Sequence, residues 1–126
     1  MRTVILSDNQ DITRVGMRCL CTQEGVLTFV EVQNRLSLVN ELLKTPDSLV
    51  ILDYPLFDFT DVEMLLVIAI RFPKTVWLLF SEQLNETFIR RLIIDESRFS
   101  IVMKDDSLEE IQECLRRGLC GERFIC

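Results

Sequence analysis

Five short apolar runs alternate with five helix-patterned segments along this sequence, and this alternation limits the fold more than any other feature. The runs, which are rich in β-branched residues, occupy 3–6, 27–32, 49–52, 75–80 and 99–103. Apolar residues at helical spacing follow each run. Uniformly apolar strands between amphipathic helices are typical of a parallel sheet covered on both faces. The pattern therefore predicts an α/β chain of the doubly wound, flavodoxin-like type, (βα)5, with strand order 2-1-3-4-5.

The same pattern predicts helix boundaries and one buried face. Thr60 is expected to cap the third helix, because Glu63 lies three residues later, and the fifth helix is expected to open at Ser107-Leu108-Glu109-Glu110. Gly25 and Gly118 are expected to end the first and fifth helices. In the first helix, helical spacing of apolar residues predicts a buried face made of Ile12, Val15, Cys19 and Leu20.

Length and charge limit the range of functions. The 126 residues fit one domain with its own hydrophobic core. The net charge of −6 argues against direct binding of DNA or of an anionic membrane by this domain. No apolar run approaches the roughly 18 residues that a membrane-spanning helix needs. We therefore expect a cytoplasmic domain that does not contact membranes.

The chain contains no histidine, and its cysteines follow no metal or redox spacing. The absence of histidine excludes Ser-His-Asp and Cys-His nucleophiles and His-ligated zinc or haem. The five cysteines are an odd number, without the CxxC spacing of redox or zinc sites and without a signal peptide. We therefore expect reduced cysteines that pack as small apolar residues.

Chemically useful side chains follow four of the five predicted strands. Asp8 follows the first strand, Asp53 the third, Ser81 the fourth and Lys104 the fifth. The carboxyl ends of parallel strands meet at one edge of the sheet, and ligands bind there at the point where the strand order reverses. We therefore expect these four side chains to share one crevice.

Two carboxylates, a hydroxyl and an amine in one crevice suit phosphoryl transfer. Asp8 and Asp53 would repel each other unless a cation lay between them, and a hard ion such as Mg²⁺ suits carboxylates, waters and a phosphate. A carboxylate can attack phosphorus, and the oxygens of the transferred group then need positive charge and hydrogen-bond donors. Asp53, at the centre of the sheet, is the natural acceptor. Lys104 would supply the charge and Ser81 a hydroxyl.

Nucleotide binding is the competing chemistry for this fold, and its sequence motifs are missing. The four glycines form neither GxGxxG nor a P-loop after any predicted strand. An FMN site would need a phosphate-cradling loop after the first strand, where the sequence has Asp8 and Asp11. We therefore expect no NAD, FAD, ATP or FMN site.

With these residues in place, nearly the whole chain resembles a response-regulator receiver domain of the CheY-like type, the phosphoacceptor module of bacterial two-component signalling. Asp53 matches the phosphorylated aspartate and Asp8 the first residue of the family's acidic pair. Ser81 matches the Thr/Ser position and Lys104 the lysine. The resemblance covers the strand ends that the pattern alone had singled out.

Three stretches resemble one subfamily, whose receiver precedes a LuxR/NarL-type helix-turn-helix. Residues 8–17, DNQDITRVGM, are similar to its "DDHPLVREGL", and residues 103–110, MKDDSLEE, to its "LKDASPEEL". Residues 121–126 are similar to the segment before its linker. The resemblance implies that residues 1–119 form the receiver. Residues 120–126 would then start a linker to a C-terminal DNA-binding domain that is absent from this chain.

The resemblance implies a function, a metal and partners. A sensor histidine kinase would phosphorylate Asp53, and the domain would form a homodimer on activation and regulate transcription. Only the attached domain would contact DNA. Mg²⁺ would be held by Asp8, Asn9, Asp53 and the backbone carbonyl of Pro55. The chain would not be an enzyme beyond self-phosphorylation from small donors and slow autodephosphorylation.

The chain departs from the family at four places. Asn9 replaces the second acid, which predicts weaker Mg²⁺ binding, and Ile101 replaces the aromatic switch residue. Glu82 follows Ser81 where a small residue is common, and the loop at 54–59 is unusually apolar. Its residues Leu56, Phe57 and Phe59 either pack locally or form a docking patch.

These departures leave other hypotheses open. One is an atypical receiver with weak or no phosphorylation, which acts through dimerisation or protein contacts. Another is a Mg²⁺-dependent phosphohydrolase on the same scaffold, which would need a general acid or base that the sequence does not reveal.

Overall fold

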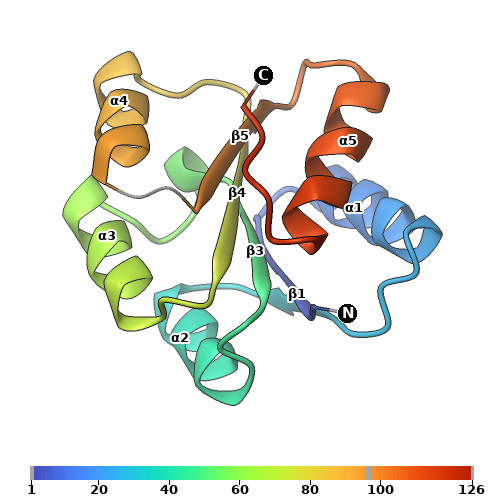
Figure 1. Ribbon diagram of the computed structural model, residues 1–126, viewed down its shortest axis with the longest axis horizontal. Coiled ribbons are helices and arrows are strands. Elements are labelled where there is room, and N and C mark those ends of the chain that lie inside the picture. The colour runs from blue at the N-terminus through green and yellow to red at the C-terminus, as the bar shows by residue number, and fades with distance from the viewer. Residues whose placement is uncertain (1, 96–97, 126) are drawn as a thin grey trace.

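The computed structural model describes residues 2–95 and 98–125, with the side chains of 93–95 outside the description. Within these residues the strands are β1 (Val4–Ser7), β2 (Phe29–Val32), β3 (Leu49–Leu52), β4 (Val76–Ser81) and β5 (Phe99–Met103). The helices are α1 (Asp11–Gln23), α2 (Arg35–Lys44), α3 (Val62–Arg71), α4 (Glu86–Asp95) and α5 (Leu108–Leu119), with a short 3-10 helix, η1 (Tyr54–Leu56). Helices α1 and α5 cover one face of the sheet, and α2, α3 and α4 cover the other (Figure 1). Among the helices so described, none is both long and apolar enough to cross a membrane.

The sheet is parallel throughout, with the order β2-β1-β3-β4-β5, which confirms the predicted fold class. Its register pairs Ser7 with Leu52 and Leu52 with Leu79. Ser7 and Leu52 end β1 and β3, so the residues that follow these two leave the sheet at the same edge. Asp8 and Asp53 therefore emerge side by side, at the point where the strand order reverses.

Each face of the sheet carries its own hydrophobic core. On the face of α2, α3 and α4, Trp77 and Phe99 are fully buried, with ring centroids 5.6 Å apart. On the other face, Met17 and Cys21 of α1 and Cys114 of α5 pack among side chains of β1, β3 and β4. Close packing on both faces holds the strands rigidly, and it therefore fixes the polar edge of the sheet.

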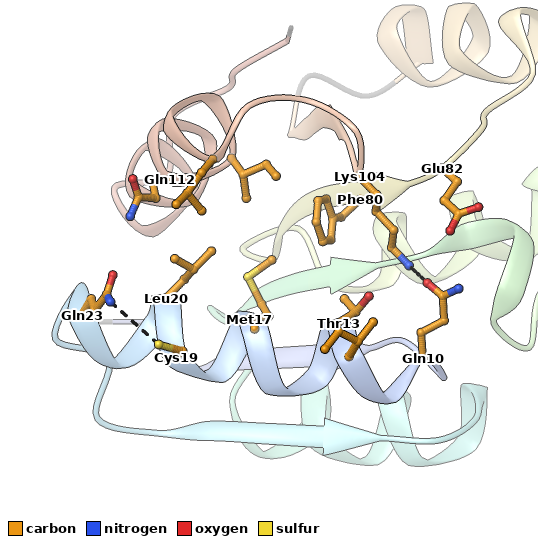
Figure 2. Close-up of a pocket in the computed structure, with 14 residues that line it drawn as sticks. Gln10, Thr13, Met17, Cys19, Leu20, Gln23, Phe80, Glu82, Lys104 and Gln112 are labelled. Atoms are coloured by element: carbon orange, nitrogen blue, oxygen red, sulfur yellow. Dashed lines mark hydrogen bonds between the residues drawn. The ribbon is translucent and has the colours of Figure 1, made fainter.

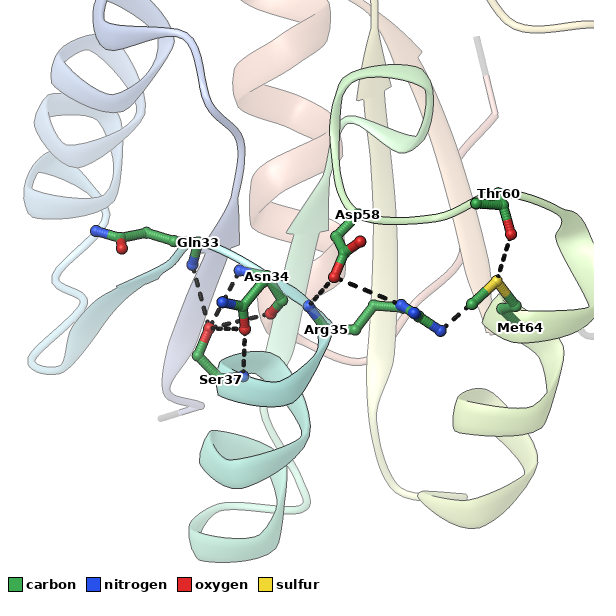
Figure 3. Close-up of polar contacts among 7 residues, drawn as sticks. All are labelled: Gln33, Asn34, Arg35, Ser37, Asp58, Thr60 and Met64. Carbon is green, nitrogen blue, oxygen red and sulfur yellow. Dashed lines mark hydrogen bonds and ion pairs between the residues drawn. The ribbon is translucent and has the colours of Figure 1, made fainter.

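Helix α3 begins one residue later than its sequence predicts. Asp61, rather than Thr60, is the N-cap, and its carboxylate accepts a hydrogen bond from the Met64 backbone N–H at 3.0 Å. The Thr60 hydroxyl lies against the Met64 sulfur, 2.8 Å away (Figure 3). Aspartate caps at least as well as threonine, so two adjacent residues competed for the position. Helix α5 opens where predicted, and Ser107 is its N-cap, with a side chain that accepts the Glu110 N–H.

Gly118 does not end α5, contrary to the prediction. The helix continues to Leu119, and the chain turns at Gly121, which has a φ of 78°. Gly118 instead allows α5 to approach β3 closely, since a Cβ there would lie 3.1 Å from Cδ1 of Leu49. Gly25, with a φ of 80°, follows α1 as predicted.

The predicted buried face of α1 is wrong for three of its four residues. Ile12 and Val15 are 80% and 67% exposed, and Cys19 is exposed as well. Met17 and Cys21, one helical turn apart, face the core instead. Apolar residues occupy two sides of α1, so spacing alone could not choose between them.

The apolar loop after β3 packs locally. Phe57 and Phe59 are 6% and 8% exposed, whereas Leu56 is 47% exposed. The Asp58 carboxylate lies between them in sequence and ties the loop to α2. It accepts the backbone N–H of Arg35 at 3.2 Å and pairs with the Arg35 guanidinium at 3.6 Å (Figure 3). Of the two hypotheses for this loop, local packing and a docking patch, local packing is therefore confirmed for Phe57 and Phe59.

The C-terminal segment lies along the outer edge of β5 (Figure 1). The Phe124 carbonyl accepts the Ile101 N–H at 3.0 Å, and the Phe124 N–H donates to Ser100 Oγ at 2.9 Å. Ile101 and Ile125 form a parallel bridge. The Phe124 side chain packs against the core under α1 and α5. The segment thus occupies backbone positions that an edge strand ordinarily leaves free.

Candidate functional site

Two buried carboxylates lie at the carboxyl edge of the sheet. Asp8 and Asp53 are each 1% exposed, and the backbone N–H of Asp53 donates to the Ser7 carbonyl at 3.1 Å. One Asp8 oxygen accepts the backbone N–H of Gln10 at 2.8 Å, which turns the chain into α1. Buried carboxylates are stable only when they are paired or hydrogen-bonded, so the surroundings of this pair must supply charge and donors.

Lys104, the residue after β5, supplies the positive charge. Its Nζ lies 2.7 Å from Oδ2 of Asp53 and 3.0 Å from Oδ2 of Asp8, and its side chain is 10% exposed. The ammonium also donates to the side-chain oxygen of Gln10 (Figure 2). One ammonium therefore faces two carboxylates, which leaves a local charge of −1 that favours a further cation.

Ser81 lies beside Lys104 at the ends of β4 and β5. The Lys104 backbone N–H donates to the Ser81 carbonyl at 2.9 Å. The Ser81 hydroxyl is buried and has no hydrogen-bond partner. Oδ1 of Asp53 is likewise buried without a hydrogen-bond partner. Oδ2 of Asp8 is also buried, and it forms an ion pair with Lys104. Unpartnered buried polar atoms are uncommon, so this group indicates a place where a ligand binds.

A small cavity opens beside Asp53. Its volume is about 180 Å³, and it is lined by Asp53, Pro55, Leu56, Glu82 and Gln83. The volume exceeds the roughly 30 Å³ of one water, so the cavity can admit a small anion or a hydrated ion. The carboxylate of Glu82 adds negative charge at its wall. An incoming anion would therefore have to be accompanied by positive charge.

The candidate metal ligands are only partly assembled. Oδ1 of Asp53 is unpartnered, and Pro55 lines the same cavity as Asp53. Both oxygens of Asp8 are engaged, one by the Gln10 N–H and the other by the Lys104 ammonium. The Asn9 amide is also engaged: its NH₂ donates to the Leu56 carbonyl at 3.0 Å. Across the described part of the chain, no three His, Cys, Asp or Glu side chains are grouped to hold a metal. Two carboxylates and a carbonyl fit a weakly held hard cation.

The aromatic switch position is occupied by a core residue. Ile101 is 4% exposed and its backbone is bonded to the C-terminal segment. Aromatic rings near the site include Phe80, whose centroid lies 5.8 Å from Nζ of Lys104. They also include Tyr54, which follows Asp53 and lies 4.2 Å from the Phe88 ring of α4 between centroids. Burial, and then the charge of Asp61, raise the pKa of the Tyr54 hydroxyl. The contact between Tyr54 and Phe88 connects the Asp53 loop to α4.

Sequence reasoning missed Gln10 and Arg14. The side-chain oxygen of Gln10 accepts a hydrogen bond from the Lys104 ammonium, and Arg14 donates one to the Asp8 carbonyl at 2.8 Å. Neither residue directly follows a predicted strand, which is the position that singled out Asp8, Asp53, Ser81 and Lys104. The signal for both is their place in the loop and first turn after Asp8, since that loop must wrap around the site.

A larger, mostly apolar groove separates α1 from α5. It has a volume of about 650 Å³, and Lys104 and Gln10 lie at one end (Figure 2). Met17 and Leu20 of α1 face Ile111 of α5 across it. Glu82 borders both the groove and the cavity beside Asp53.

Comparison with known proteins gives a fold but no sequence family. No protein-family model matches the chain, and no curated protein matches its sequence. The RcsB response regulator of Salmonella typhimurium, in a structure concerned with DNA interaction, matches with a TM-score of 0.77 and 22% identity. That match covers 100% of this chain and 63% of RcsB, so the chain spans less than two thirds of that protein.

Two further structures agree. The isolated receiver (REC) domain of Salmonella enterica RcsB, solved with the phosphomimetic BeF₃⁻, matches with a TM-score of 0.77 and 21% identity over 99% of this chain and 93% of that one. The CheY-like protein TadZ of Pseudomonas aeruginosa matches with a TM-score of 0.63 and 9% identity over 93% of this chain and 98% of that one. The chain therefore has the fold of the CheY-like receiver domains of response regulators.

Proposed function

We propose that this chain is the cytoplasmic receiver domain of a two-component response regulator. It accepts a phosphoryl group on Asp53 from a sensor histidine kinase in the presence of Mg²⁺. The observation that supports this most is the ammonium of Lys104, which lies within 3.0 Å of both buried carboxylates. A buried carboxylate that is both oriented by a cation and unpartnered at its second oxygen suits attack on a phosphoryl group.

The two oxygens of Asp53 have different roles in this proposal. Oδ2 is held by Lys104 at 2.7 Å, whereas Oδ1 has no hydrogen-bond partner. Oδ1 attacks phosphorus, a P–O bond forms, and the P–N bond to the donor histidine breaks with its electron pair leaving on nitrogen. Lys104 would then neutralise the new phosphoryl oxygens, and the unpartnered hydroxyl of Ser81 would donate a hydrogen bond to one of them.

Mg²⁺, when bound, would offset the negative charge of the phosphoryl oxygens. Asp8, Asp53 and the Pro55 carbonyl would hold it. Asn9 could contribute its amide oxygen, but the bond from its NH₂ to Leu56 and the loss of one charge both weaken its contribution. We therefore expect weaker Mg²⁺ binding by the wild type than by Asn9→Asp. Equal affinity of the two proteins for Mg²⁺ in a titration would contradict this.

Phosphorylation from a small donor tests the proposal. After incubation with acetyl phosphate and Mg²⁺, intact mass spectrometry is expected to show one added phosphoryl group on the wild type and none on Asp53→Asn. Asp58→Asn is the matched control, because Asp58 lies in the same loop but pairs with Arg35. It is expected to be phosphorylated like the wild type.

A second function is favoured by a specific observation, the carboxylate of Glu82 on the wall of the cavity beside Asp53. It would repel a phosphoryl donor, so the domain could act through dimerisation or protein contacts with little phosphorylation. No mass gain on the wild type, under conditions that phosphorylate a control receiver, would favour this function over the first.

We propose further that the phosphorylated domain forms a homodimer and regulates an attached DNA-binding domain. The support for the DNA-binding part is the fold shared with the RcsB response regulator, whose structure is described in terms of conformational dynamism for DNA interaction. Light scattering with and without BeF₃⁻ and Mg²⁺ tests the first step. We expect the mass to double when both are added. An unchanged monomer that nevertheless binds BeF₃⁻ would refute dimerisation on activation.

A further inference from the structure

The side chain of Asn9 connects the two loops that flank the site. Its NH₂ group donates to the carbonyl of Leu56 at 3.0 Å, which joins the loop after β1 to the loop after Asp53. On its other side, the guanidinium of Arg14 donates to the Asn9 side-chain oxygen at 3.5 Å and to the Asp8 carbonyl at 2.8 Å. Arg14, Asn9 and Leu56 thus form a continuous chain of polar contacts between α1 and η1.

The chemistry of these neighbours fixes which way the amide points. The Leu56 carbonyl can only accept a hydrogen bond, so it requires the NH₂ group of Asn9. The guanidinium of Arg14 can only donate, so it requires the amide oxygen. Both partners select the same orientation. A carboxylate at this position would satisfy Arg14 but would place a negative oxygen against the carbonyl of Leu56.

We infer that Asn9 is a positioning residue that holds the Asp53 loop to the β1–α1 loop without a metal ion. An ionised aspartate at position 9 has no hydrogen to donate to the Leu56 carbonyl, so it could join the same two loops only through a bridging group such as a cation or a water. Asparagine joins them through its own N–H. The inference about the direct bond does not depend on phosphorylation of Asp53. The comparison with a cation rests on the proposed Mg²⁺ site.

Amide hydrogen exchange in the Asp53 loop reports directly on this bond. The backbone N–H of Phe57 donates to the Asp53 carbonyl at 3.0 Å, and that of Phe59 to the Phe57 carbonyl at 2.8 Å. Both amides therefore lie in the loop that Asn9 holds, and both can be followed by NMR. Exchange measures loop opening and does not require phosphorylation.

Two variants of Asn9, compared with the wild type, test whether the direct bond holds the loop and whether a cation can replace it. In EDTA we expect both amides to exchange a few-fold faster in Asn9→Asp and in Asn9→Ala than in the wild type, since one exposed hydrogen bond is lost. Mg²⁺ at a concentration that saturates Asn9→Asp, but neither the wild type nor Asn9→Ala, is expected to restore the wild-type rate in Asn9→Asp and to leave Asn9→Ala fast. At this concentration the wild-type rate is expected to be the same as in EDTA.

Asn34→Asp is the matched control for the added charge. Asn34 caps α2 through its side-chain oxygen, which accepts the Ser37 N–H at 2.9 Å, and aspartate caps equally well (Figure 3). We expect no change at Phe57 or Phe59 in this variant. Unchanged exchange in Asn9→Asp with EDTA would overturn the inference. Faster exchange that Mg²⁺ does not reverse would overturn the equivalence with a cation, and the phosphorylation assay would be unaffected by either result.

Discussion

The Nζ atom of Lys104 lies 2.7 Å from Oδ2 of Asp53, a residue 51 positions earlier in the chain. Their side chains are 10% and 1% exposed, so water screens this ion pair poorly. The same ammonium is also the counter-charge of Asp8, 3.0 Å away. One cation therefore stabilises the buried acidic pair and orients the proposed nucleophile, and both properties depend on the same residue.

Lys104→Met is expected to destabilise the domain by about 3 kcal/mol at neutral pH without Mg²⁺, because it leaves Asp8 and Asp53 buried without their counter-charge. Urea unfolding in EDTA measures the loss. In the double variant Asp53→Asn/Lys104→Met only one carboxylate remains, so we expect about half of the loss to be recovered. A double variant as unstable as Lys104→Met would show that charge burial is not the cause.

Gly118→Val tests the close approach of α5 to β3. A Cβ at Gly118 would already lie 3.1 Å from Leu49, so a branched side chain must displace the helix, and we expect a loss of about 2 kcal/mol. Gly16→Ala is the control, since a Cβ at Gly16 meets nothing within 4 Å. In the middle of α1 it should stabilise by about 0.5–1 kcal/mol. Thermal unfolding measures the stability of both variants. Equal changes in the unfolding midpoint for Gly118→Val and Gly16→Ala would refute the packing argument.

Cys21 is expected to resist alkylation while Cys19 and Cys120 react, because only the latter two are exposed. Burial, reinforced by Glu24 and opposed by Arg18, raises the pKa of the Cys21 thiol from 9.0 to about 12. Iodoacetamide labelling with peptide mapping tests this. Rapid labelling of Cys21 in the folded protein would contradict its burial.

The raised pKa of Cys21 also predicts a pH dependence of stability. Below pH 9.0 the thiol is protonated in both the folded and the unfolded chain and contributes no slope. Between pH 9.0 and about 12 only the unfolded chain ionises, so the free energy of unfolding falls as pH rises. Cys21→Ala should show a shallower fall over this range. Parallel curves for the two proteins would refute the shift.

Glu82→Gln is expected to speed phosphorylation by acetyl phosphate about threefold at low salt, because it removes negative charge from the wall of the cavity beside Asp53. The initial rate of mass gain measures the effect. Added salt should shrink the difference between variant and wild type, since salt screens the charge. A difference that persists at high salt would indicate a steric rather than an electrostatic barrier.

The sheet and the acidic pair could be predicted because their signals are local. Each strand is a continuous apolar run, and a parallel register brings the next residue of every strand to one edge, so Asp8 and Asp53 follow from position alone. Lys104 joins them because β5 ends at the same edge. The clustering of these three side chains required no knowledge of side-chain contacts.

Features that depend on competition between neighbours could not be predicted. Asp61 displaced Thr60 as the cap of α3, since both residues can cap a helix. The choice between two apolar sides of α1 depended on how the helix packs against the sheet, which buried Met17 and left Ile12 exposed. The role of Asn9 depended on a carbonyl 47 residues away. Sequence spacing contains none of this information.

The position of the C-terminal segment makes the two edges of the sheet unequal as templates for strand addition. At β2 the outer edge borders no strand within the described residues. At β5 the backbone N–H of Ile101 is already committed to Phe124. A foreign strand that pairs with β5 must first compete with a segment of the same chain, whose effective concentration is high because it is tethered. Edge-to-edge association through β5 is therefore disfavoured until that segment is released.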